Sequence, residues 1–93
     1  MLDSMCRSIQ RLHNVVPPAT SEEVRAAALQ YVRKISGTVR PSQVNQAAFE
    51  RAVDEVTAVS AHLLEHLTSP AAPQDRELAA ARRRLARAVR HTP

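Results

Sequence analysis

The pentapeptide HLLEH at residues 62–66 has the spacing H-x-x-E-H, which is the signature of the inverted zinc peptidases. Two histidines four residues apart on a helix can bind one zinc ion. A peptidase also needs a third ligand, a position for water and a dry cleft. The downstream carboxylate that could serve is Glu77, and a chain of this size has little room for a cleft. We therefore interpret His62 and His66 as solvent-facing helix residues, with weak metal binding as an alternative, and expect no enzyme activity.

The single cysteine, Cys6, is followed seven residues later by His13. A thiolate is both a soft metal ligand and a nucleophile, and cationic neighbours such as Arg7 and Arg11 favour the thiolate form. Together with Asn14 these residues form a candidate functional thiol region, in which Cys6 and His13 are a second weak alternative for a metal site. The competing interpretation is a small structural thiol.

Four arginines near the end of the chain share one side of an expected helix: Arg76, Arg83, Arg87 and Arg90. An apolar seam occupies the opposite side of that helix: Leu78, Leu85 and Val89. If the seam packs inward, the arginines face outward. A charge run of this kind is most often a solvated face. The alternatives are the phosphate backbone of a nucleic acid and an acidic protein surface, so we take the four arginines as a candidate anionic-partner stripe.

The composition predicts one small helical domain. Of the 93 residues, 44% are hydrophobic, 2% are aromatic and only one is glycine. A chain of this length buries about 60–65% of its unfolded surface, which leaves no room for a large internal active site. One glycine excludes a glycine-rich phosphate loop, and one cysteine excludes an intramolecular disulfide and a zinc ribbon. The net charge of +4 is compatible with an acidic partner.

No apolar run approaches the ~20 residues that span a bilayer, and no secretory signal is visible. We therefore expect a soluble cytoplasmic protein without membrane association and without a cofactor.

Three helices are expected from periodicity and capping signals. Thr20 and Glu23 predict a capping box at the start of the first helix, and Gly37 predicts a left-handed C-cap at its end. The second helix is expected to begin at the N-cap Ser42 and to end before Pro70, with a length of roughly 40 Å. Apolar residues at helical spacing define the expected core faces of these two helices: Val24, Ala27, Ala28, Tyr31, Val32 and Ile35, then Phe49, Ala52, Val53, Val56, Val59, Ser60, Leu63, Leu64 and Leu67. Leu29 lies off the first stripe and is expected to be covered by the N-terminal segment or by a second subunit.

The chain divides into four segments of a single domain. They are an extended N-terminal arm (1–19), a two-helix core hairpin (20–69), a Pro-rich linker (70–75) and an Arg-rich C-terminal helix (76–93). Asp75 is the expected N-cap of the last helix, the linker is a candidate hinge, and no strand is expected. The predicted fold class is all-α: a three-helix bundle of short, long and short helices with an extended arm. Association of two copies is a natural way to cover the rest of the long helix.

An ordered series of motifs runs through the chain: Met5–Arg7, Leu12–Asn14, Pro17–Thr20, Ser36–Gly37, Arg40–Ser42 and Asn45–Phe49. The series resembles a family of small bacterial proteins known only as domain of unknown function twenty-two seventy-seven. Three features depart from that pattern: the histidines of HLLEH, the pair Val15–Val16, which stands where an aromatic and an acidic residue are expected, and the residues Met1–Ser4, which precede the usual start. Met5 is thus an alternative translation start, and its removal would make Cys6 the first residue. The resemblance supports the fold and implies no activity.

These observations favour a non-enzymatic protein-interaction module, which is expected to bind a protein partner or a second copy of itself in a homodimer. One alternative is a basic protein associated with nucleic acid. Another is a metal- or redox-responsive protein that uses Cys6.

Overall fold

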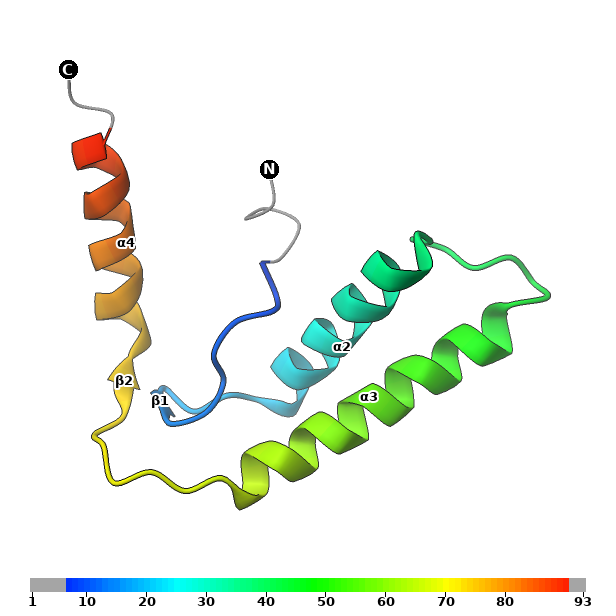
Figure 1. The fold of residues 1–93 in the computed structure, drawn as a ribbon, viewed down its shortest axis with the longest axis horizontal. Coiled ribbons are helices and arrows are strands. Elements are labelled where there is room, and N and C mark those ends of the chain that lie inside the picture. The colour runs from blue at the N-terminus through cyan, green and yellow to red at the C-terminus, as the bar shows by residue number, and fades with distance from the viewer. Residues whose placement is uncertain (1–6, 91–93) are drawn as a thin grey trace.

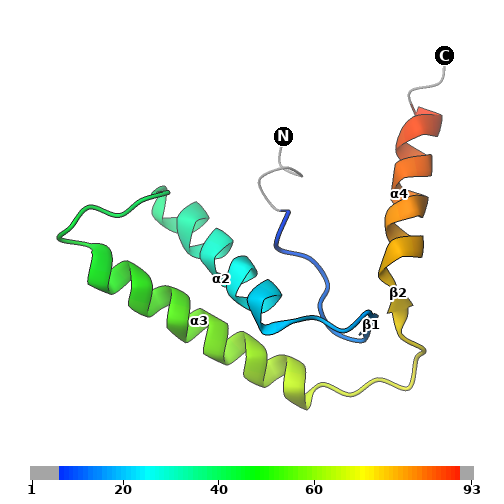
Figure 2. The same ribbon diagram turned by 180° about the vertical axis from the view of Figure 1, so that it is seen from behind.

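The computed structural model describes residues 7–90, with Arg90 described for its backbone alone. Three helices and two very short strands follow one another along the chain: β1 (Val15–Val16), α2 (Ser21–Ser36), α3 (Gln46–His66), β2 (Gln74–Asp75) and α4 (Arg76–Arg90). The helices α2 and α3 lie side by side as an antiparallel hairpin, and α4 stands apart from them (Figures 1 and 2). A mostly helical fold with three helices is therefore confirmed.

The two ends of α2 are formed by the predicted local interactions. The hydroxyl of Thr20 accepts a hydrogen bond from the backbone N–H of Glu23 at 3.1 Å, and the Glu23 carboxylate accepts one from the Thr20 N–H at 2.9 Å. This is the expected capping box. At the other end Gly37 has φ 68°, so the predicted left-handed C-cap is also present.

The helix α3 begins later and ends earlier than expected. Its N-cap is Asn45, not Ser42, because residues 43–45 form a turn that returns the chain toward α2. Ser42 stabilises this turn: its carbonyl accepts from the Asn45 N–H at 3.0 Å and its hydroxyl from the Asn45 amide at 3.2 Å. The last helical residue is His66, and Leu67 is already extended before Pro70 is reached. With 21 residues, α3 is about 32 Å long.

The hydrophobic core lies between α2 and α3. Its fully buried members are Ala28, Val32 and Val53, and four half-buried hydrophobic residues pack against them: Leu29, Phe49, Ala52 and Val56. Leu29, which lay off the predicted stripe, thus belongs to the rim of the core. Because the buried residues are small, the two helix backbones can approach closely.

A large part of the predicted core faces is not buried. The exposed fractions of Val59 and Leu63 are 70% and 55%, and those of Tyr31 and Ile35 are 46% and 67%. The assignment of these residues to the core was wrong for a geometric reason. The molecule is flat, with principal extents of 50 × 38 × 15 Å, and α4 stands apart from both helices of the hairpin (Figures 1 and 2). The hairpin is a single layer, and no second layer covers its flat faces in residues 7–90.

The two short strands were not expected. They pair in parallel, with Val15 opposite Gln74 and Val16 opposite Asp75, and so join the arm to the linker. Alternation of polar and apolar residues becomes a signal only over about 4–8 residues, so a two-residue strand leaves no pattern in the sequence.

The helix α4 is capped as predicted but packs differently. The Asp75 carboxylate accepts a hydrogen bond from the Leu78 N–H at 3.0 Å, which confirms the N-cap. The expected packing of this helix along the hairpin is absent from the described part of the chain: Leu85 and Val89 of the apolar seam are 66% and 65% exposed. The half-buried side chains of α4 are Arg76 and its neighbours Ala79 and Ala80. The helix therefore turns its arginine–alanine side inward, which reverses the predicted orientation.

Among residues 7–90, no helix is both long enough and apolar enough to cross a bilayer.

Candidate functional site

The candidate site lies at the junction of the arm, the linker and the start of α4 (Figure 1). The arm reaches it from α2, where the backbone N–H of Ser8 donates a hydrogen bond to the side-chain oxygen of Gln30 at 2.8 Å. At its other end the arm becomes β1 and pairs with the linker. The arm is thus attached at both ends, and it carries polar side chains of its N-terminal motifs to the first turns of α4.

Asn14 is the residue that ties the arm to the linker. Its φ of 54° is in the left-handed region, which asparagine tolerates better than most residues. Its side-chain amide donates to the carbonyl of Ala71 at 3.1 Å, and its own carbonyl accepts from the N–H of Gln74 at 2.9 Å. Asn14 was predicted as part of a thiol region, and the structure gives it a role in fixing the linker.

Arg11 is held against the same stretch of backbone. Its Nε donates to the carbonyl of His13 at 2.9 Å, and one terminal nitrogen lies 3.4 Å from the carbonyl of Asn14. These bonds fix the guanidinium relative to the start of α4. His13 is half-buried and contributes its backbone oxygen to this arrangement.

The first turn of α4 is joined to α2 by an ion pair with two hydrogen bonds. Arg76 donates to the two carboxylate oxygens of Glu23 at 2.5 and 3.1 Å, and the side chains are 22% and 30% exposed, respectively. The hydrogen bonds from Arg76, and then the one from the backbone N–H of Thr20, lower the pKa of Glu23. The same pair raises the pKa of Arg76. Arg76 was predicted to face outward with the stripe, and the pair with Glu23, 53 residues away, explains why it does not.

A cleft of about 220 Å³ opens between the arm and α4. It is lined by three arginines, two glutamines and two alanines: Arg11, Arg76, Arg83, Gln10, Gln74, Ala79 and Ala80. The structure therefore brings Arg11 of the predicted thiol region together with two members of the predicted anionic-partner stripe. Arg87 is exposed and does not line this cleft, and the side chain of Arg90 is not described. Sequence reasoning missed Gln10 and Gln74, because no local pattern links residues so far apart.

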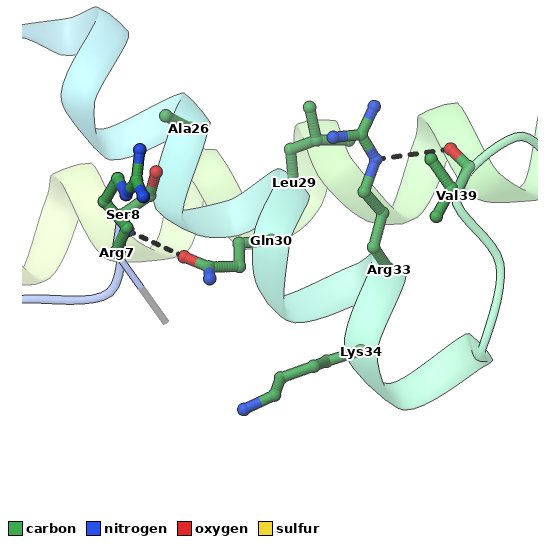
Figure 3. Close-up of a pocket in the computed structure, with 8 residues that line it drawn as sticks. All are labelled: Arg7, Ser8, Ala26, Leu29, Gln30, Arg33, Lys34 and Val39. Carbon is green, nitrogen blue, oxygen red and sulfur yellow. Dashed lines mark hydrogen bonds between the residues drawn. The ribbon is translucent and has the colours of Figure 1, made fainter. Parts of the chain in front are cut away.

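Arg7 lies elsewhere, in a second cavity on the outer side of α2 (Figure 3). This cavity also contains Arg33 and Lys34, but their side chains extend in different directions, and Arg33 Nε donates to the carbonyl of Val39 at 3.2 Å. Cys6 lies outside the described residues, so the structure describes four of the five members of the thiol region, and a metal- or redox-responsive role of Cys6 stays a prediction.

The histidines of HLLEH lie at the end of α3. Both side chains are exposed, their ring centroids are 4.2 Å apart, and His66 Nδ1 is 2.9 Å from the carbonyl oxygen of His62. Leu64 is half-buried, whereas Leu63 is exposed and not in the core as expected. Within residues 7–90, no three potential His, Cys, Asp or Glu ligands are grouped around a common point.

Comparison with known proteins gives one match. Residues 5–82 match the family model DUF2277, described as an uncharacterized conserved protein, which confirms the predicted resemblance. The matched segment includes the arm, the hairpin, the linker and the first two turns of α4. No curated protein and no solved structure matches the chain.

Proposed function

The chain belongs to DUF2277, a family of uncharacterized conserved proteins, and on this footing we propose that it is a non-enzymatic interaction module that acts as a homodimer. The observation that carries the proposal is the single-layer hairpin with uncovered apolar side chains. Stable domains are built from two packed layers around a core. A second copy would supply the layer that one chain lacks.

Part of the uncovered surface is a groove between the end of α2, the connecting loop and the start of α3, with a mixed apolar and polar lining. It has a volume of about 640 Å³, and its apolar lining includes Ile35, Ala48, Phe49 and Ala52. Further along α3, Val59 is exposed as well. An interface that buries these side chains would remove apolar surface from water, which is the main favourable term in protein association.

The accessible surface is large enough for such an interface. It measures 7598 Å², whereas the size scaling of compact monomers gives about 5,300 Å² for a chain of 10.2 kDa. The excess of roughly 2,300 Å² belongs to the whole open chain, and it exceeds the ~800 Å² that each partner contributes to a standard interface.

Charge complementarity supports a second copy of the chain as the partner that covers the apolar surface of the hairpin. The helix α3 carries four carboxylates and one arginine, a net charge of −3, and α4 carries six arginines and one glutamate, a net charge of +5. Within one chain α4 points away from α3 (Figure 1). In a dimer, the exposed seam of α4 would pack on the apolar face of the partner's α3. The arginine stripe on the other side of α4 would then contribute a long-range attraction to the net negative charge of α3, and no direct ion pair across the interface is required.

The proposal is tested by sedimentation equilibrium of the full chain and two matched variants. Val59→Glu places a charge on the proposed interface, and Ala47→Glu places the same charge on an exposed residue of α3 that does not line the groove. We expect a mass of two chains for the wild type and for Ala47→Glu, and one chain for Val59→Glu. A monomeric wild type, or equal dissociation of both variants, would show that the proposed interface is wrong.

A further inference from the structure

The cleft between the arm and α4 has a chemical character that the proposed dimer does not use. No Asp or Glu is among the described residues that line it, whereas three arginines are. One of them, Arg76, is neutralised by Glu23. Within residues 7–90, Arg11 and Arg83 have no carboxylate partner and leave two positive charges in the cleft. Positive groups that are gathered in a concave site attract and concentrate anions.

Three features of its arginines show that the cleft is prepared to bind an anion. Arg11 is held in place by two backbone carbonyls, so its orientation is set before a ligand arrives. The side chain of Arg83 makes no hydrogen bond or ion pair within residues 7–90, so its five guanidinium N–H groups are available. The Nε of Arg76 is buried and has no acceptor in the described part of the chain, which is a costly state for a charged donor.

The remaining lining favours a small oxyanion. Gln10 and Gln74 can offer amide donors, and the methyl side chains of Ala79 and Ala80 leave space beside α4. Guanidinium groups match the oxygen spacing of phosphate, to which they donate in pairs. A volume of about 220 Å³ admits a phosphoryl group with a small substituent. Among the described lining residues there is no aromatic ring on which a base of single-stranded nucleic acid could stack.

From these observations we infer that the cleft formed by Arg11, Arg76 and Arg83 binds a phosphoryl group, either as inorganic phosphate or as a small phosphate monoester. All the ligating groups come from one chain, so the site does not depend on dimer formation. The bound anion would join the arm to α4 at a second point, in addition to the pairing of β1 with β2. It would thereby hold α4 in the orientation seen in Figure 1.

The test is a titration of the ¹⁵N-labelled full chain with inorganic phosphate, at constant ionic strength and with chloride as the reference anion. We expect saturable shifts of the backbone amides of Gln74, Ala79 and Ala80. Arg83→Gln should weaken phosphate binding about tenfold, because it removes a charge-assisted hydrogen-bonding group. Arg82→Gln removes the same charge from the same helix outside the cleft, and it should leave the affinity unchanged. A parallel titration with methyl phosphate separates the two sources, because tighter binding of the ester indicates a phosphorylated metabolite and equal or weaker binding indicates free phosphate.

The inference is overturned if the shifts do not saturate, or if Arg82→Gln and Arg83→Gln weaken binding equally. A short DNA duplex provides a further arm of the experiment. Duplex binding that weakens equally in both variants, in the absence of saturable phosphate binding, would indicate a diffuse nucleic-acid surface in place of a phosphoryl site.

Discussion

The α2–α3 hairpin and the helix α4 are positioned by different kinds of interaction. The hairpin is held by a narrow apolar core in which Ala28, Val32 and Val53 are buried. None of the described side chains of α4 is fully buried. Polar contacts of its first residue and of the linker before it position the helix: the Glu23–Arg76 pair, the strand pairing and the Asn14 amide. Removal of apolar volume should therefore unfold the hairpin, whereas removal of polar groups at the junction should release α4 and leave the hairpin folded.

The largest effect is expected from Val53→Ala, which removes two methyl groups from the centre of the core, where Val53 is 2% exposed. The loss of buried apolar surface and the remaining cavity should lower the free energy of unfolding by about 1.5–3 kcal/mol. Urea denaturation followed by circular dichroism measures this change. Val44→Ala makes the same truncation at an exposed site and should change the stability by less than about 0.5 kcal/mol. Equal effects of the two variants would contradict a core at Val53.

The difference between the hairpin and α4 also explains which features could be predicted from the sequence. The capping box at Thr20, the C-cap at Gly37 and the N-cap at Asp75 were predicted because each depends on residues within a few positions of one another. The core contacts of Val32 and Val53 were predicted because a helical stripe marks the side on which a helix packs. These are the local parts of the fold.

The parts that could not be predicted depend on long-range contacts. Leu63 and Val59 continue the apolar stripe of α3, but whether they are buried depends on a second layer, and a stripe does not show whether that layer belongs to the same chain. For α4 the seam of leucines suggested the inward side, and the pair of Arg76 with Glu23 reverses it. The cleft was missed for the same reason, since Arg11 and Arg83 were placed in separate predicted sites.

Asn14→Ala should have the second largest effect, and it acts on the junction. The substitution removes the amide that donates to Ala71 and places an alanine at φ 54°. We expect a loss of roughly 1–2 kcal/mol in the local stability of the junction, measured as faster amide hydrogen exchange at Gln74. Asn14→Gly removes the amide but tolerates the left-handed backbone, so it should have a smaller effect. If Asn14→Gly is as disruptive as Asn14→Ala, the backbone conformation contributes little.

Arg76→Gln should have a smaller and more local effect. It breaks the ion pair with Glu23 but leaves the capping box between Glu23 and Thr20 in place. The amides in the first turn of α4 should then exchange faster, whereas those of α2 should be unchanged. Arg84→Gln removes the same charge from an exposed position of α4 and serves as the control. Faster exchange throughout α2 would mean that the pair stabilises the hairpin as well, and the contrast between the two regions would be weaker than the structure indicates.

The smallest effect is expected when the pH is lowered. This change should reduce the amide protection of α4 and of the hairpin to different extents without a mutation. The pKa of Glu23 in the folded chain lies below its ordinary value of 4.5, mainly because Arg76 donates to the ionised carboxylate. The stabilisation is therefore complete above the ordinary pKa and is lost as the pH falls through the lowered folded value. In that acid range the α4 amides should lose protection before those of the hairpin, whose core contains no titratable group among its buried members. In Glu23→Gln the side chain does not titrate, so the exchange of the α4 amides should start faster and depend less on acid than in the wild type. The same acid dependence in both proteins would assign the change to other carboxylates, and the Glu23–Arg76 pair would then not be what holds α4 against α2.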